Sequence, residues 1–258
     1  MAAKFLSNTS GEFLKTKRTA AFWLTLLGAA FVPIINFIKC VARPDVFVPR
    51  YKANVWNIFI NENWEVASAF LLVVYIILVT GLVIQIEYRN NTWKQVYASP
   101  RTYADIFFSK LIVMLVMILL CFILFNVFII LSGLAINLAR PNYNFYSTPI
   151  PLMKMLLLSG RMFIAISGII GIQYFLSLRF RNFIVPMAMG LGLLIAGFII
   201  RQWEHIDYYP YMYGILAYFK NPGLPQDTLQ KVLIHSVLWF GLFLGLGFGY
   251  SVWRRERG

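Results

Sequence analysis

The sequence predicts an all-α polytopic membrane protein with six transmembrane helices, and three observations lead to this fold class. Hydrophobic residues make up 60% of the 258 residues and charged residues only 13%, whereas soluble domains are about half apolar and about a quarter charged. The apolar residues gather into six long runs. Short basic segments flank several of these runs, as is typical of the cytoplasmic ends of membrane helices.

Each of the six runs is long enough to cross a bilayer. The hydrocarbon core is about 30 Å thick, so a helix needs about 20 apolar residues to span it. Helices are expected because unpaired backbone groups are costly in lipid. The runs lie at about residues 20–38, 66–86, 106–134, 155–178, 183–200 and 232–253. They leave no room for a soluble domain, so residues 1–258 are expected to form a single transmembrane domain.

The stretch before the first run, residues 10–18, is amphipathic and basic. Ser10 could cap a helix there, and that helix could lie on the membrane surface as an elbow helix. A frayed basic tail is the alternative. The first run is long for a signal peptide and no small-residue cleavage site follows it, so we expect it to be retained as the first span.

The basic residues favour both termini in the cytoplasm. Residues 178–182 (LRFRN) and 254–257 (RRER) are short and strongly basic, and such segments resist translocation. The loops on the opposite side would then span residues 39–65, 135–154 and 201–230. In the last loop, residues 211–219 could form a short interfacial or re-entrant helix, with an ordinary aromatic belt as the alternative.

The sequence offers no catalytic, cofactor-binding or metal-binding motif. The two histidines, His205 and His235, belong to no metal-ligand pattern. No nucleophile elbow, no paired intramembrane carboxylates and no phosphate-binding loop are present. The net charge of +13 comes without a nucleic-acid-binding motif. We therefore attribute this charge to contact with anionic lipid and expect neither enzymatic activity nor nucleic-acid binding.

Few ionisable or polar residues lie inside the predicted spans, although such residues often mark a transport path. Arg161, near the start of the fourth span, is the best candidate, and snorkelling to the outer interface is the alternative. Asn126 and Gln173 could also line a path, or they could form hydrogen bonds between helices.

Two spans carry small residues at a spacing of four. One stripe is Gly241, Gly245 and Gly249, and the other is Ala188, Gly192 and Ala196. Such stripes let helices approach closely. The spacing leaves open whether they pack within one chain or between two.

The connection between the second and third runs, residues 87–110, is the most informative part of the sequence. Trp93, Val96 and Tyr97 would share one face of a short helix. Pro100 would end this helix, and a new one would begin near Thr102. The short amphipathic helix would rest on the membrane or on a partner protein, and a plain interfacial turn is the alternative.

At this connection the sequence resembles the ABC-2 type permeases, the membrane subunits of ATP-binding-cassette exporters. The likeness is strongest to the six-span permeases of the bacteriocin-export and lantibiotic-immunity kind. Residues 12–18 (EFLKTKR) before the first span are similar too. Asn91 stands where the family commonly has Gly, and Asn also tolerates a left-handed turn. The positions that match the family motif are Glu87, Thr92, Trp93, Pro100, Arg101 and Lys110.

The resemblance implies a cytoplasmic coupling helix between spans two and three that docks on a separate ABC ATPase. Residues 89–101, beginning at Arg89, would form the contact surface. ATP and Mg would be bound by that ATPase and not by this chain. A second permease chain, identical or related, would complete the path.

The same resemblance favours export across the bacterial cytoplasmic (inner) membrane, and apolar spans without buried charge fit a peptide, lipid or other hydrophobic substrate. Two other functions stay open from the sequence. One is an ion-coupled carrier or channel, which would need more buried ionisable residues than Arg161. The other is a membrane-embedded lipid-modifying enzyme or its scaffold, which would need a reactive cluster facing a cavity.

Overall fold

The computed structural model describes residues 2–17, 19–89, 102–219 and 227–253. These residues form helices of the α, π and 3-10 types and no strand. The predicted all-α class is therefore confirmed.

Five helices of the described ranges are long and apolar enough to cross a membrane. The second of them is continuous through three elements, α4 (Val55–Val66), the π-helix η1 (Ala67–Leu71) and α5 (Leu72–Arg89). The five are α2 (Ala20–Ala42), the helix Val55–Ile86, α7 (Tyr103–Ala139), α8 (Leu152–Arg179) and α11 (Thr228–Trp253).

The fifth apolar run forms α9 (Ile184–Ile199), which is apolar but shorter than the others. At 1.5 Å per residue its 16 residues extend about 24 Å. Each predicted run thus coincides with a helix, and five of the six reach the length needed to span.

The predicted outer loop at residues 39–65 is wrong, because most of it is helical. It contains α3 (Pro44–Tyr51) and α4 (Val55–Val66). Trp56, Phe59 and Trp64 are fully buried, and Trp64 packs edge-on against Phe125 of α7. The polar residues between these aromatic side chains gave the segment the composition of a loop, although its apolar residues recur at helical spacing.

The N-terminal helix also begins earlier than predicted. Helix α1 covers Ala2–Thr16, so Ser10 lies in its interior and the prediction that Ser10 caps it is wrong. Residues 2–6 (AAKFL) are mostly good helix formers, which explains the extension.

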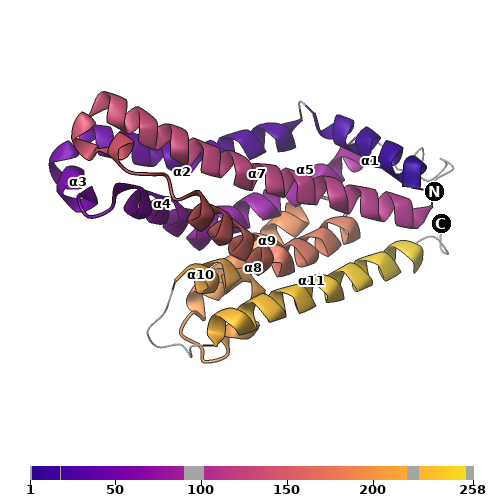
Figure 1. Ribbon diagram of the computed structural model, residues 1–258. Coiled ribbons are helices and arrows are strands. Elements are labelled where there is room, and N and C mark those ends of the chain that lie inside the picture. The colour runs from indigo at the N-terminus through magenta and orange to yellow at the C-terminus, as the bar shows by residue number, and fades with distance from the viewer. Residues whose placement is uncertain (1, 18, 90–101, 220–226, 254–258) are drawn as a thin grey trace.

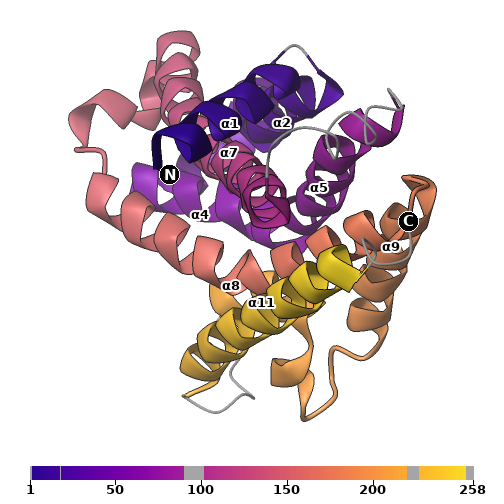
Figure 2. The ribbon, with the colours of Figure 1, turned by 90° about the vertical axis from the view of Figure 1, so that its right-hand side faces the viewer.

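The helices form two groups that meet along α5 and α8. In one group α2 packs along α7, and in the other α8 packs along α11. Helix α5 contacts both α8 and α9 and joins the groups. Helix α1 and the last turn of α11 lie at the same end of the molecule (Figure 1, with the view along the helices in Figure 2), which fits an even number of crossings.

A compact hairpin follows α9 and folds back onto the bundle. It contains 3-10 turns at Ile206–Tyr208 (η4) and Pro210–Met212 (η5), and the helix α10 (Tyr213–Tyr218). Tyr211 and Tyr213 are fully buried. The short helix predicted within residues 211–219 is present, and it packs against α8 and α11.

The glycine stripe of α11 faces away from the other residues that the structure describes. A Cβ atom added at Gly241, Gly245 or Gly249 would have no neighbour within 4 Å, and the same holds for Gly192 of α9. These residues therefore make no close helix contact within the described part of the chain. In contrast, a Cβ at Gly190 would overlap the side chain of Gln173.

Candidate functional site

The structure reaches only part of the predicted coupling segment. Glu87 and Arg89 lie in the last turn of α5. Thr92, Trp93, Pro100 and Arg101 fall outside the described residues. The coupling helix and its contact surface therefore stay a prediction.

Helix α7 begins directly after this segment, at the predicted position. The Thr102 hydroxyl accepts a hydrogen bond from the Asp105 amide at 3.1 Å, and the Asp105 carboxylate accepts one from the Thr102 amide at 3.3 Å. This reciprocal pair is a capping box, which satisfies two amides at the helix start. The third span therefore has a well-defined first turn where the predicted coupling segment joins it.

Lys110 of the matched motif is buried between α7 and α1. Its Nζ contacts Glu12 Oε2 at 3.0 Å, and the exposed fractions of the two side chains are 2% and 7%. Lys15 contacts the other oxygen of Glu12 at 2.7 Å. Burial raises the pKa of Glu12, but the two ammonium groups outweigh this effect and hold the pKa below its ordinary value.

We call this arrangement the α1–α7 clamp, made of Glu12, Lys15 and Lys110. It is supported by a contact between Thr9 Oγ1 and Ser109 Oγ at 3.4 Å. Glu12 and Lys110 are 98 positions apart. The sequence marks both as positions of family likeness, but nothing in its periodicity indicates that they form a pair.

Asn126 and Gln173 both make hydrogen bonds between elements. Asn126 Nδ2 donates to Ser159 Oγ at 2.8 Å and so joins α7 to α8. Gln173 Nε2 donates to Tyr211 Oη at 2.7 Å and so joins α8 to the hairpin after α9. These contacts fit the packing role that was one of the two possibilities for each residue.

Arg161 lies nine residues into α8, which begins at Leu152. It is half-buried, and its buried Nε has no hydrogen-bond partner among the described residues. Nearby, Tyr218 of α10 donates to the Asn61 carbonyl at 2.7 Å. The pKa of Tyr218 is raised to about 12, chiefly by burial, and this net value includes a smaller increase from Glu65 and a decrease from Arg161. The Lys154 ammonium of α8 donates to Asn57 Oδ1 of α4 at 2.8 Å, and Arg161 and Glu65 lie seven and eight residues further along these two helices.

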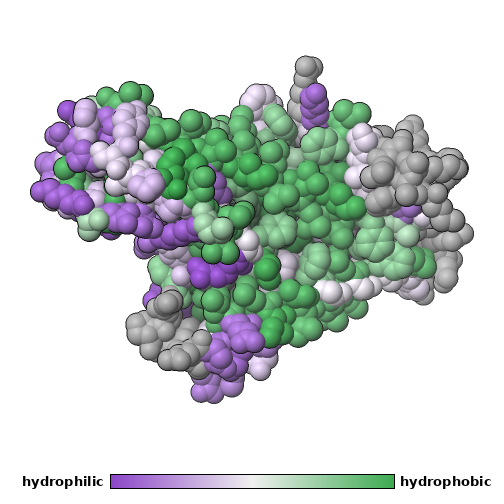
Figure 3. Space-filling model, viewed as in Figure 1, coloured by the Kyte–Doolittle hydropathy of each residue, from purple (hydrophilic) through white to green (hydrophobic). Residues whose placement is uncertain are grey.

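We call Asn61, Glu65, Arg161 and Tyr218 the α4–α8 polar cluster. Three separate elements supply it, namely α4, α8 and α10. Figure 3 shows a hollow on this side of the molecule, between the part that holds α3 and α4 and the part that holds α10, with hydrophilic side chains along it. The sequence indicated Arg161 alone, because Glu65 and Tyr218 belong to segments that looked like loops.

A second cluster of charges lies at the end of α2, around Glu62. The Glu62 carboxylate contacts Lys39 at 2.6 Å, Arg50 at 3.0 Å and the Tyr51 hydroxyl at 2.7 Å. Burial raises the pKa of Tyr51 well above its ordinary value, and the hydrogen bond to Glu62 adds to this effect. The cluster connects α3 to α2 and α4, and no pattern in the sequence indicated it.

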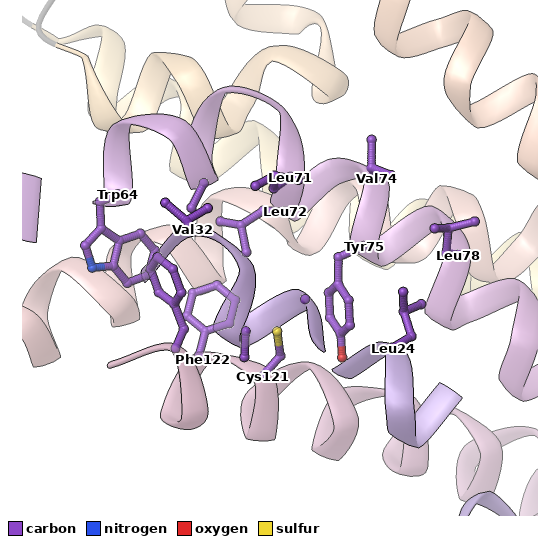
Figure 4. Close-up of a pocket in the computed structure, with 14 residues that line it drawn as sticks. Leu24, Val32, Trp64, Leu71, Leu72, Val74, Tyr75, Leu78, Cys121 and Phe122 are labelled. Carbon is purple, nitrogen blue, oxygen red and sulfur yellow. The ribbon is translucent and has the colours of Figure 1, made fainter. Parts of the chain in front are cut away.

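An apolar cavity of about 100 Å³ lies between α2, α5 and α7, beside the π-helix η1. Leu24, Val32, Trp64, Leu72 and Cys121 are among its lining residues (Figure 4). Its lining is almost wholly apolar, so it suits a small apolar group and no ionic chemistry. Single π-helical turns inside α-helices are frequent at functional sites, and this one borders the cavity.

Among the residues that the structure describes, no group of three or more His, Cys, Asp or Glu side chains could hold a metal ion. Cys40 and Cys121 are buried and form no disulfide.

Comparison with known proteins identifies the family. No curated protein and no solved structure matches the chain. The model of the ABC-2 family transporter proteins matches residues 10–197, from the second half of α1 to the end of α9. This match covers well over half of the 258 residues, and the chain therefore belongs to the ABC-2 family of transporter proteins, as a permease of an ABC transporter.

Proposed function

We propose that this permease works with a separate ABC ATPase and a second permease chain to export a peptide, lipid or other hydrophobic substrate. The single observation that carries the proposal is the family match over residues 10–197. The second permease chain is identical or related, and the complex resides in the bacterial cytoplasmic membrane.

The proposed topology has six crossings with both termini in the cytoplasm. Helix α9 is the shortest crossing, and α1 lies at the cytoplasmic surface as an elbow helix. The common end of α1 and α11 in Figure 1 supports this topology. So does the hydrogen bond from Gln85 Nε2 to the Arg181 carbonyl at 2.8 Å, because it holds the ends of α5 and α8 at one level.

In this proposal the ATPase binds ATP and Mg and pushes on residues 87–101. The α1–α7 clamp then moves together with the first turns of α7, because Lys110 holds Glu12 at 3.0 Å. The substrate path would open to one side and then to the other as ATP shifts the balance between the two states.

The partner is tested by co-expressing the chain with ABC ATPases of the same organism and purifying the complex through a tag on the permease. Trp93→Ala and Arg101→Glu should release the ATPase. The control Arg140→Glu changes an exposed arginine at the far end of α7 and should retain it. Full retention of the ATPase by both test variants would overturn the assigned contact surface, and absence of any ATPase from the wild-type preparation would overturn the function.

The topology is tested by labelling single cysteines from outside intact cells. Cys40 and Cys121 are buried and are first replaced by alanine. A cysteine at Asn91 should resist a membrane-impermeant reagent, whereas one at Tyr146, which is 56% exposed near the opposite end, should react. Rapid labelling at position 91 would contradict the cytoplasmic location.

A further inference from the structure

The α4–α8 polar cluster lies at a definite depth in the proposed bilayer. Counting back from the ends of the apolar spans Leu152–Arg179 and Val55–Ile86, Arg161 is 18 residues before Arg179 and Glu65 is 21 residues before Ile86. At 1.5 Å per residue these distances are about 27 Å and about 32 Å. The hydrocarbon core is about 30 Å thick, so both charges lie near the boundary opposite the termini.

The position of the end of α2 independently places Glu65 near the same membrane boundary. Lys39, in the last turn of α2, contacts Glu62 at 2.6 Å. Glu65 is one helical turn closer to the bilayer centre than Glu62. Glu65 is therefore at the level where lipid headgroups meet the acyl chains.

The two charged side chains of the cluster have no partner among the described residues, unlike the buried carboxylates. Glu62 is paired with Lys39 and Arg50, and Glu12 is paired with Lys15 and Lys110. In contrast, neither Glu65 nor Arg161 forms an ion pair or a side-chain hydrogen bond with a described residue.

Opposite charges at membrane depth are normally paired, because an isolated charge is costly there. Here a carboxylate and a guanidinium come from α4 and α8, which the hydrogen bond from Lys154 to Asn57 holds side by side about two turns earlier, and both remain available. A ligand with one anionic and one cationic group would satisfy them together.

The surface just below the charges is apolar. Towards the bilayer centre, Val66 and Phe70 are 49% and 47% exposed, and Ile164 of α8 is 42% exposed. The surface is therefore charged at the membrane boundary and apolar on the side towards the bilayer centre. This is the distribution of an amphiphile whose zwitterionic head carries acyl chains.

We propose that the α4–α8 polar cluster binds the headgroup of a zwitterionic phospholipid, with the phosphate at Arg161 and the ammonium at Glu65. Guanidinium groups suit phosphate because they donate parallel hydrogen bonds to two oxygens. The Tyr218 ring lies at the headgroup level, where tyrosines are enriched. As a statement about the substrate class this rests on the proposed function, whereas the binding itself can be measured on the permease alone.

The test is lipid retention by the purified full chain, measured by native mass spectrometry without the ATPase. Phosphatidylethanolamine and phosphatidylglycerol are added separately, because both carry a phosphate and only the first carries an ammonium. We expect the wild-type chain to prefer phosphatidylethanolamine. Glu65→Gln and Arg161→Gln should each weaken that binding about tenfold, which is typical for loss of one charged hydrogen bond.

Two further sets of variants separate binding from folding. Glu65→Asp and Arg161→Lys keep the charges and should retain much of the binding. Asp227→Asn and Lys231→Gln remove a different ion pair, which joins the two side chains at 2.9 Å on the exposed start of α11, and should bind as wild type does. Each variant is first checked for a single elution peak and an unchanged Tm.

Equal retention of the two lipids, unchanged by Glu65→Gln, would overturn the assignment. So would displacement of phosphatidylethanolamine by a short peptide with free termini at lower concentration than by lipid, since a peptide would then be the better ligand. Neither result bears on the pairing with an ATPase. Conversely, a permease that binds no ATPase but retains the lipid would overturn the proposed function and leave this site standing.

Discussion

The α1–α7 clamp yields the sharpest prediction. Glu12→Gln removes the carboxylate that contacts Lys110 at 3.0 Å and Lys15 at 2.7 Å. Because the Glu12 and Lys110 side chains are 7% and 2% exposed, solvent screens them little. Breaking a buried pair by removing one member destabilises by about 3–5 kcal/mol, so we expect a loss of about 3 kcal/mol in the docking of α1 on α7.

A local crosslink measures this docking directly. The hydroxyls of Thr9 and Ser109 are 3.4 Å apart, so cysteines at these two positions should form a disulfide, detected by peptide mass spectrometry. Glu12→Gln should lower its yield strongly. Lys110→Met should have a smaller effect, because Lys15 remains beside Glu12. The double change Glu12→Leu with Lys110→Met should recover part of the yield, since replacing a whole buried pair with apolar residues is often neutral.

The same clamp predicts a pH dependence with a defined sign. The pKa of Glu12 is lower in the folded protein than its ordinary value of 4.5. Its stabilising effect is therefore complete above about pH 4.5 and is lost as the pH falls through the lower folded-state pKa. The control Lys15→Gln removes a partly exposed partner and should cost less than about 1 kcal/mol. An unchanged disulfide yield in Glu12→Gln at neutral pH would refute the reasoning.

Two other perturbations have clear expected outcomes. Glu62→Gln removes the carboxylate shared by Lys39 and Arg50, whose side chains are 32% and 59% exposed, and should destabilise by about 1–2 kcal/mol, seen as a lower Tm in detergent and easier proteolysis of α3. Gly190→Leu should disrupt packing of α9, because a Cβ there already overlaps Gln173, whereas Gly192→Leu meets nothing within 4 Å and should leave the Tm of the single chain unchanged. Equal Tm values for the two glycine variants would contradict the packing of α9.

The sequence was sufficient to predict the long helices, because the length of an apolar run can be read from consecutive residues. All six runs correspond to helices, and the start of α7 was placed correctly from Thr102 and the proline before it. The failure at residues 39–65 has a physical cause. There the membrane helix continues beyond the hydrocarbon level, so polar residues such as Asn61 and Glu65 alternate with buried aromatic ones and the mean composition resembles a loop.

The site was harder to predict, because its contacts join residues far apart in the chain. Lys110 was singled out from the family motif, but its partner Glu12 is 98 positions away. Arg161 was singled out as a charge in a span, but Glu65 and Tyr218 lie in segments expected to be loops. Residues Thr92 to Arg101 were assigned by resemblance, and that assignment still awaits the co-purification test.

The short α9 has a consequence for the surrounding lipid. The helix extends about 24 Å, and Ile184 and Ile199 at its two ends are 60% and 78% exposed. In the proposed topology α9 is a crossing shorter than a bilayer core of about 30 Å, and hydrophobic mismatch of this kind is relieved by local thinning at a fraction of a kcal/mol per Å. Lipids beside α9 would then have their two leaflets drawn together, which shortens the distance that a polar group must travel to change sides.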